Sequence, residues 1–134
     1  MKDIVIFGAG CLGREVACYI ERINRVEREW NLIGYFDDGI AKGSKNQYGV
    51  VLGGIEELNK WETELAVVIA IGSPGIIKSI VGKISNTKVY FPNIIDPSVC
   101  FLDRQTVSMG RGNVIGPNSL ISCNVETGNF NLKE

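Results

Sequence analysis

The 134-residue sequence contains no histidine, and its four cysteines, at positions 11, 18, 100 and 123, form none of the close pairs typical of a zinc site or a redox dithiol. We therefore expect no metal site. Cys11 lies in a glycine-rich turn near a predicted helix N-terminus, where a thiolate is favoured. A nucleophilic cysteine also needs a base, which no histidine can supply, so no catalytic residue is assigned. The other three cysteines are expected to be small, buried apolar residues.

The sequence also lacks a basic cluster and any apolar run of membrane-spanning length. With a formal net charge of −1 and a pI near 5.5, it offers no electrostatic basis for binding nucleic acid or an anionic membrane. The first predicted strand follows Met1 so closely that no room remains for a signal peptide, and a cytoplasmic location is expected. A hydrophobic content of 45% suffices for the core of one domain with a short appendage.

The most informative stretch is residues 4–13, where a β-branched and aromatic run leads directly into Gly8-x-Gly10-x-x-Gly13. The apolar residues of 14–26 then follow helical spacing, so the glycines lie at a strand-to-helix junction. In a dinucleotide-binding turn the first glycine turns tightly, the second lets a ligand approach and the third lets the helix pack on the strand. This context predicts phosphate or pyrophosphate binding at the helix N-terminus. The alternative is a glycine turn that binds nothing.

A second strand, from 31 or 32 to 36, ends in Asp37-Asp38-Gly39. An acid at this position binds a ribose hydroxyl in dinucleotide folds, so Asp37 is a candidate nucleoside contact; alternatively, the Asp-Gly sequence only closes the strand. The polar, glycine-rich stretch 39–49 is expected to be a mobile loop over the site.

Strand and helix signals continue as far as residue 91. After an apolar piece at 50–54 and a short helix at 55–61, we expect a buried strand at 65–71 that ends in Gly72-Ser73. Ser73 and Pro74 suit the start of a helix at 76–84, and Lys78 in that helix either reaches a phosphate or is solvated. With a short strand at 89–91, the chain predicts four parallel strands with right-handed crossovers. The predicted unit is only half of a dinucleotide-binding fold. It therefore disfavours NAD as the ligand and favours a mononucleotide or a nucleotide-sugar.

The pattern changes near residue 96, so we divide the chain into domains 1–95 and 96–134. Met109, Ile115 and Ile121 are six apart and are separated by turn residues. This spacing predicts the first coils of a left-handed parallel β-helix, and an ordinary meander is the alternative. The inward positions then become Thr127 and Lys133, so about two coils are expected. A β-helix that stops after two coils leaves its last strands without a covering neighbour. This open end favours self-association as a dimer or trimer.

Together the two parts resemble the bacterial sugar acetyltransferases of the sialic acid O-acetyltransferase and UDP-4-amino-sugar N-acetyltransferase type. The matching motifs are IVIFGAGCLGREVA (4–17), GYFDD (34–38), VLGG (51–54), AIGS (70–73), FPNIIDPS (91–98) and GNVIGPNSLISCNV (112–125). The resemblance implies an α/β fold with a half-sized Rossmann-like sheet that holds a nucleotide-sugar or sugar. It also implies a trimer formed through the β-helices, with acetyl-CoA bound between neighbours. The substrate-binding residues that it implies are Gly8, Gly10, Cys11, Leu12, Gly13, Asp37, Asp38, Gly72, Ser73 and Lys78.

The sequence departs from this family at the catalytic base, which in family members is a histidine on a later coil. We therefore expect a C-terminally truncated member that binds a nucleotide-sugar, with acetyl-CoA the co-substrate of the family and its site largely missing here. A non-catalytic nucleotide-sugar-binding or oligomerisation module is the alternative. A fragment of an NAD-binding oxidoreductase is a third interpretation, which the sixfold repeat disfavours.

Overall fold

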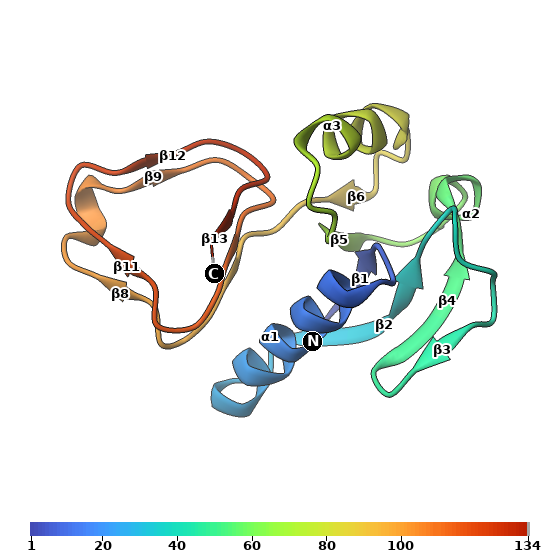
Figure 1. Ribbon diagram of the computed structural model, residues 1–134, viewed down its shortest axis with the longest axis horizontal. Coiled ribbons are helices and arrows are strands. Elements are labelled where there is room, and N and C mark those ends of the chain that lie inside the picture. The colour runs from blue at the N-terminus through green and yellow to red at the C-terminus, as the bar shows by residue number, and fades with distance from the viewer. Residues whose placement is uncertain (134) are drawn as a thin grey trace.

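The computed structural model describes residues 1–133, in which an α/β unit and a triangular coil lie side by side (Figure 1). The α/β unit consists of β1 (Lys2–Phe7), α1 (Cys11–Val26), β2 (Trp30–Phe36), β3 (Lys45–Asn46), β4 (Gly49–Gly53), α2 (Ile55–Asn59), β5 (Leu65–Ile69), α3 (Pro74–Lys83) and β6 (Val89–Tyr90). The coil consists of β7 (Ile94–Ile95), β8 (Cys100–Phe101), the 3-10 helix η1 (Arg104–Thr106), β9 (Ser108–Met109), β10 (Val114–Ile115), β11 (Leu120–Ile121), β12 (Glu126–Thr127) and β13 (Leu132–Lys133).

The sheet of the α/β unit has the strand order β3-β4-β2-β1-β5-β6, and all its pairs are parallel except β3 with β4. The prediction of four parallel strands is wrong by one, because the apolar piece at 50–54 forms β4 beside β2. The expected loop at 39–49 is also partly wrong. It contains β3 and a turn in which the side chain of Asn46 accepts a hydrogen bond from the Tyr48 N–H at 2.8 Å.

Both faces of the sheet are covered, as the aliphatic strands predict. Ile4 and Ile6 of β1 face α1, and together with Val16 and Ile20 of that helix they belong to one core cluster. Val5 and Phe7 face the opposite side, where Leu58 of α2 and Ile80 of α3 complete a second cluster. The glycine-rich turn therefore follows a strand that is fully enclosed, which fixes its position.

The triangular coil is a parallel β-helix, so the predicted fold class is confirmed: a half-sized Rossmann-like sheet followed by the first coils of a β-helix. Val114 pairs with Ile94 in the coil below and with Leu132 in the coil above, at separations of 20 and 18 residues. The longer first coil accommodates η1. Ile115 and Ile121 are buried inside, and Met109 is half-buried.

The turns of the β-helix carry the sixfold repeat more regularly than the side chains do. Gly112, Asn118, Asn124 and Phe130 are six residues apart, and all have positive φ, between 55° and 72°. Glycine and asparagine adopt this conformation readily, which explains the turn composition. The strands continue through Thr127 and Lys133 although neither residue is aliphatic, because the backbone ladder to β9 and β10 does not depend on the inward side chain.

The two parts are joined at α1. Ile94 and Val114 belong to the same core cluster as α1, and Arg22 of the helix donates two hydrogen bonds to the buried Asp96, at 2.6 and 3.2 Å. The Arg22 hydrogen bond, with two further bonds from Ser98, lowers the pKa of Asp96 to about 2 against the opposing effect of burial. Asp96 is therefore ionised and fixes the start of the β-helix to α1.

The expectation of buried cysteines is wrong at two positions. Cys100 and Cys123 are exposed, because both lie on outward-facing positions of the β-helix, and only Cys18 on α1 is half-buried. The thiol of Cys18 is hydrogen-bonded to the hydroxyl of Tyr48 at 3.1 Å. Within residues 1–133 no helix is long and apolar enough to cross a membrane, and no three histidine, cysteine or acidic side chains gather as metal ligands.

Candidate functional site

Two of the three glycines in the turn after β1 are required by the fold itself. Gly8 has a φ of +114°, and a Cβ there would lie 2.6 Å from the Ala70 carbonyl oxygen. A Cβ on Gly13 would lie 2.0 Å from the Gly8 carbonyl oxygen, so α1 packs directly on the turn. Gly10 differs, because its φ of −84° is accessible to any residue and no atom lies within 4 Å of a Cβ placed there. The open space beside Gly10 is where a ligand can approach the backbone.

The N-terminus of α1 opens onto this space. No side chain caps the helix at Gly10, and the first helical hydrogen bond is donated by the Arg14 N–H to the Gly10 carbonyl at 3.2 Å. The N–H groups of Cys11, Leu12 and Gly13 therefore lack a partner within the helix. Free N–H groups at the positive end of a helix dipole form a binding site for an anion.

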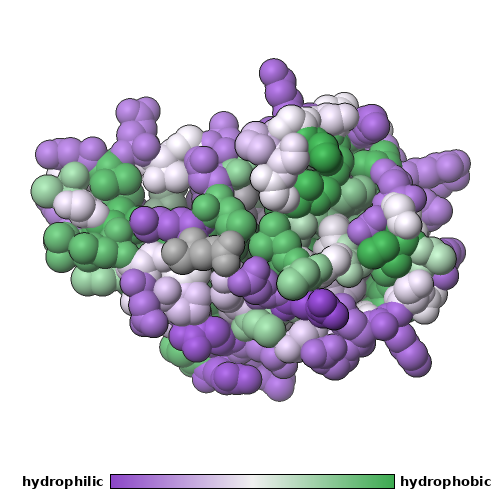
Figure 2. All heavy atoms as spheres, in the orientation of Figure 1, coloured by the Kyte–Doolittle hydropathy of each residue, from purple (hydrophilic) through white to green (hydrophobic). Residues whose placement is uncertain are grey.

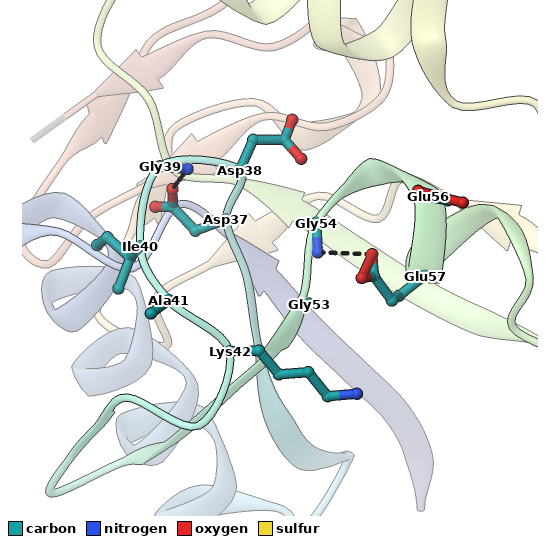
Figure 3. Close-up of a pocket in the computed structure, with 10 residues that line it drawn as sticks. All are labelled: Asp37, Asp38, Gly39, Ile40, Ala41, Lys42, Gly53, Gly54, Glu56 and Glu57. Atoms are coloured by element: carbon teal, nitrogen blue, oxygen red, sulfur yellow. Dashed lines mark hydrogen bonds between the residues drawn. The ribbon is translucent and has the colours of Figure 1, made fainter.

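Asp37 fixes the glycine turn to the end of β2. Its Oδ2 accepts a hydrogen bond from the Ala9 N–H at 2.9 Å, and its Oδ1 accepts one from the Gly39 N–H at 2.7 Å. Asp37 thus closes the turn after β2, as one interpretation predicted, and also contacts the glycine turn. The Asp38 carboxylate points in a different direction (Figure 3) and accepts a hydrogen bond from the Ile55 N–H at the start of α2, at 2.9 Å.

Two cavities of opposite charge adjoin the end of β2. A cavity of about 520 Å³ is lined by Asp37, Asp38, Glu56 and Glu57, with Lys42 as its one cation among the described residues (Figure 3). The hydrogen bond from the Gly54 N–H, 3.0 Å from Oε2, lowers the pKa of Glu57, which keeps this wall anionic.

The second cavity, of about 200 Å³, is lined by Ala9, Arg14, Tyr35 and Lys45. It is basic, and Ile40 lines both cavities and lies between them. Burial raises the pKa of Tyr35, so its hydroxyl stays neutral and donates to Asn46 at 3.4 Å. Sequence reasoning missed Arg14 and Lys45. Arg14 lies within the motif at 4–17 but was given no role there, and only the hairpin of β3 and β4 brings Lys45 back to the glycine turn.

The remaining predicted residues lie on the other side of the turn. Gly72 follows β5, the strand next to β1, and Ser73 occupies the N-cap position of α3 without making a side-chain capping bond. Lys78 lies apart from the two cavities described so far. It lines a third cavity of about 290 Å³ between α3 and the β-helix. The structure thus brings the glycine turn, Asp37 and Asp38 together, and places Lys78 elsewhere.

A Rossmann-like unit with an uncapped glycine turn, continued by a parallel β-helix, defines a class of two-part proteins in which an α/β domain precedes a solenoid. Within that class, the family model of the PglD N-terminal domain matches residues 3–84. This is more than half of the sequence, and the chain belongs to this family, whose relatives are sugar acetyltransferases. A search of curated proteins found no match.

Solved structures share the fold over nearly the whole chain. The acetyltransferase domain of PglB from Neisseria gonorrhoeae FA1090, in complex with acetyl coenzyme A, is 19% identical, with a TM-score of 0.77 over 98% of this chain and 60% of that one. A mutant perosamine N-acetyltransferase from Caulobacter crescentus, in complex with CoA and GDP-perosamine, is 16% identical, with a TM-score of 0.73 over 100% of this chain and 60% of that one. The chain spans about 60% of the length of these structures.

Proposed function

We propose that this chain is the substrate-binding part of a sugar acetyltransferase and that it binds a nucleotide-sugar at the glycine turn. The observation that carries the proposal is Gly10. It is the one glycine of the three whose lack of a side chain no protein contact requires, and it lies beside three N–H groups without helical partners. A diphosphate placed there would accept hydrogen bonds from the N–H groups of Cys11, Leu12 and Gly13.

The charges of the two cavities support an orientation for the rest of the ligand. Arg14 and Lys45 make the smaller cavity suitable for phosphate oxygens. The acidic cavity is unfavourable for phosphate but offers carboxylate acceptors to the hydroxyl groups of a ribose or the N–H groups of a base. We therefore place the nucleoside towards Asp37 and Asp38 and the diphosphate over the glycine turn. Gly8 contributes through its positive φ, which gives the turn its conformation.

The proposed acyl donor is acetyl-CoA, because the PglB domain was solved in complex with it. The 134 residues contain no histidine to act as the general base, so the proposal gives this chain a binding role and names no catalytic residue. The proposed location is the cytoplasm, where nucleotide-sugars and acetyl-CoA are both present. NAD is the competing ligand.

A second role, assembly of several copies through the β-helix, is favoured by the outer face of β8 and β11. Leu102 and Leu120 are 63% and 55% exposed there, and Cys100 is paired with Leu120. Association as a trimer would cover these side chains. Light scattering at high protein concentration tests this role, and a monomer would exclude it.

The test of nucleotide-sugar binding is calorimetric titration with UDP, GDP, CMP, NAD and acetyl-CoA. We expect a nucleoside diphosphate to bind, and we expect Gly10→Ala to weaken that binding by about tenfold or more, because a methyl group would occupy the ligand's approach. Gly82→Ala is the matched control, since a Cβ on Gly82 also meets no atom within 4 Å but lies on α3. Binding of NAD alone, or equal affinity of both variants for the diphosphate, would refute the proposal.

A further inference from the structure

The hairpin of β3 and β4 carries a tyrosine in its two-residue turn, which consists of Gln47 and Tyr48. Such turns usually contain glycine, proline, asparagine, aspartate or serine. The Tyr48 side chain is half-buried, and it packs against the core cluster that includes residues of β1 and α1. It therefore contacts a part of the molecule outside the hairpin, which gives the turn a reason to contain an aromatic residue.

Two sets of hydrogen bonds connect this hairpin to its surroundings. The Tyr48 hydroxyl is hydrogen-bonded to the thiol of Cys18 on α1 at 3.1 Å, and this bond raises the pKa of Tyr48, so the hydroxyl stays neutral. The side-chain oxygen of Asn46 accepts hydrogen bonds from the Tyr48 N–H at 2.8 Å and from the Tyr35 hydroxyl at 3.4 Å. Tyr48 thus holds the turn against α1, and Asn46 holds β3 against β2.

The position of β3 depends on these contacts because the strand has few others. It is two residues long, forms the edge of the sheet and is paired with β4 alone (Figure 1). On the face shown in Figure 2, hydrophilic side chains predominate along the lower edge of the molecule, where α1 and the turn of the hairpin lie, so solvent reaches this region. A short edge strand in such surroundings opens easily.

Lys45 on β3 makes the position of the hairpin important for ligand binding. Its side chain is exposed, forms no ion pair within residues 1–133 and lines the basic cavity together with Arg14. Neither Tyr48 nor Cys18 lines the basic or the acidic cavity. An effect of Tyr48 on a ligand in these cavities must therefore be transmitted by the hairpin that carries Lys45.

We propose that Tyr48 is a positioning residue: its bond to Cys18 holds the hairpin against α1 and so keeps the Lys45 ammonium beside the diphosphate. The inference rests on the proposed function, because it needs a diphosphate at the glycine turn. It also gives α1 two tasks in anion binding. The first turn of the helix provides N–H groups, and Cys18, about two turns further along, fixes the position of a cation.

The first test is calorimetric titration of the whole chain with UDP and GDP. Tyr48→Phe removes only the hydroxyl and should weaken binding of the tighter of the two nucleotides about threefold, the effect of one lost hydrogen bond. Tyr90→Phe is the matched control and should leave the affinity unchanged, because Tyr90 is also half-buried and its hydroxyl has no hydrogen-bond partner among the described residues. Cys18→Ala should act like Tyr48→Phe, whereas Cys18→Ser keeps a hydroxyl for Tyr48 and should retain the affinity.

A double variant distinguishes positioning from a general loss of stability. Lys45→Gln removes the cation and should weaken nucleotide binding about tenfold. If Tyr48 acts through Lys45, adding Tyr48→Phe to Lys45→Gln should cause no further loss, because the group that the tyrosine positions is already absent. A second threefold loss in the double variant would show that Tyr48 acts by another route and would overturn the inference.

A measurement on the native chain avoids substitutions altogether. If the contact between Tyr48 and Cys18 favours nucleotide binding, the nucleotide must favour that contact by the same factor. Saturating UDP or GDP should therefore slow the alkylation of Cys18 by iodoacetamide about threefold, as measured by mass spectrometry of peptides. The exposed Cys100 and Cys123 are internal controls and should react at unchanged rates.

The outcomes separate this inference from the proposed function. If UDP or GDP binds but neither Tyr48→Phe nor the alkylation rate of Cys18 shows the expected change, the positioning role is refuted and nucleotide binding stands. If neither nucleotide binds, the proposed function and the positioning role fail together.

Discussion

The ion pair between Arg22 and Asp96 predicts a specific pH dependence of stability. The Asp96 carboxylate is 1% exposed and its pKa is lowered from 3.8 to about 2, chiefly by the hydrogen bond from Arg22. A carboxyl whose pKa is lower in the folded state stabilises the fold above its unfolded pKa. That contribution is lost as the pH falls through the folded value, here between about pH 5 and 2.

The shift corresponds to about 2 kcal/mol at neutral pH as an upper bound. The Arg22 side chain is 43% exposed and solvent screens it, so about 1 kcal/mol is the more realistic figure. Asp96→Asn removes the charge and keeps the shape. The variant should therefore be less stable than the native chain at pH 6, and about half of the difference should remain at pH 3.

Urea denaturation of both chains at pH 6 and pH 3, followed by circular dichroism, measures this difference. Asp103→Asn is the control, because Asp103 is an exposed carboxylate of the same coil and its variant should follow the native chain at both pH values. If Asp96→Asn shows the same loss of stability at pH 6 and pH 3, the charge of Asp96 is not what joins the two parts.

Three further substitutions test the packing around the site, each by urea denaturation at pH 7. Gly13→Ala should destabilise the fold by about 3 kcal/mol, because its Cβ would lie 2.0 Å from a backbone oxygen, and a fully stable variant would contradict the close packing of α1 on the turn. Asp38→Ala should cost about 1 kcal/mol, because its carboxylate accepts the bond of the Ile55 N–H at the start of α2, whereas Asp3→Ala, which loses a bond from the Asn31 side chain, should cost less. Asn113→Ala should cost about 3 kcal/mol, because its buried side-chain amide donates to Asn93 in one neighbouring coil and bonds Gly128 and Asn131 in the other. Its loss should broaden the NMR signals of the β-helix before those of the sheet.

The sequence predicted those parts of the fold whose signals are local. The run at 4–7, the glycines and the helix after them are determined by neighbours in the chain, and the structure places all of them as expected. The hexad spacing succeeded for the same reason, since each turn of the β-helix repeats every six residues, with Asn118 and Asn124 in the same conformation.

The parts that sequence reasoning missed depend on contacts between distant residues. Whether residues 50–54 form a loop or a strand is decided by the free edge of β2, which a local pattern does not reveal. Lys78 lies on α3 as the sequence predicted, but only the packing of the β-helix beside α3 creates the cavity that Lys78 and Phe130 both line, and its binding role stays a prediction. The binding roles of Gly10 and Asp37 remain predictions that the titrations test.

Helix α1 connects the chemistry of the two parts. Its N-terminus carries the N–H groups of the proposed diphosphate site, and Arg22, about 16 Å further along the axis, holds Asp96 at the start of the β-helix. Since a helix is rigid over this length, the position of the coil that carries Phe130 is fixed relative to the glycine turn. A ligand that contacts both the glycine turn and the β-helix would meet two parts whose separation is set before it binds, so little ordering cost would offset its contacts. The ion pair at Asp96 therefore fixes the β-helix relative to the proposed nucleotide site without contacting that site.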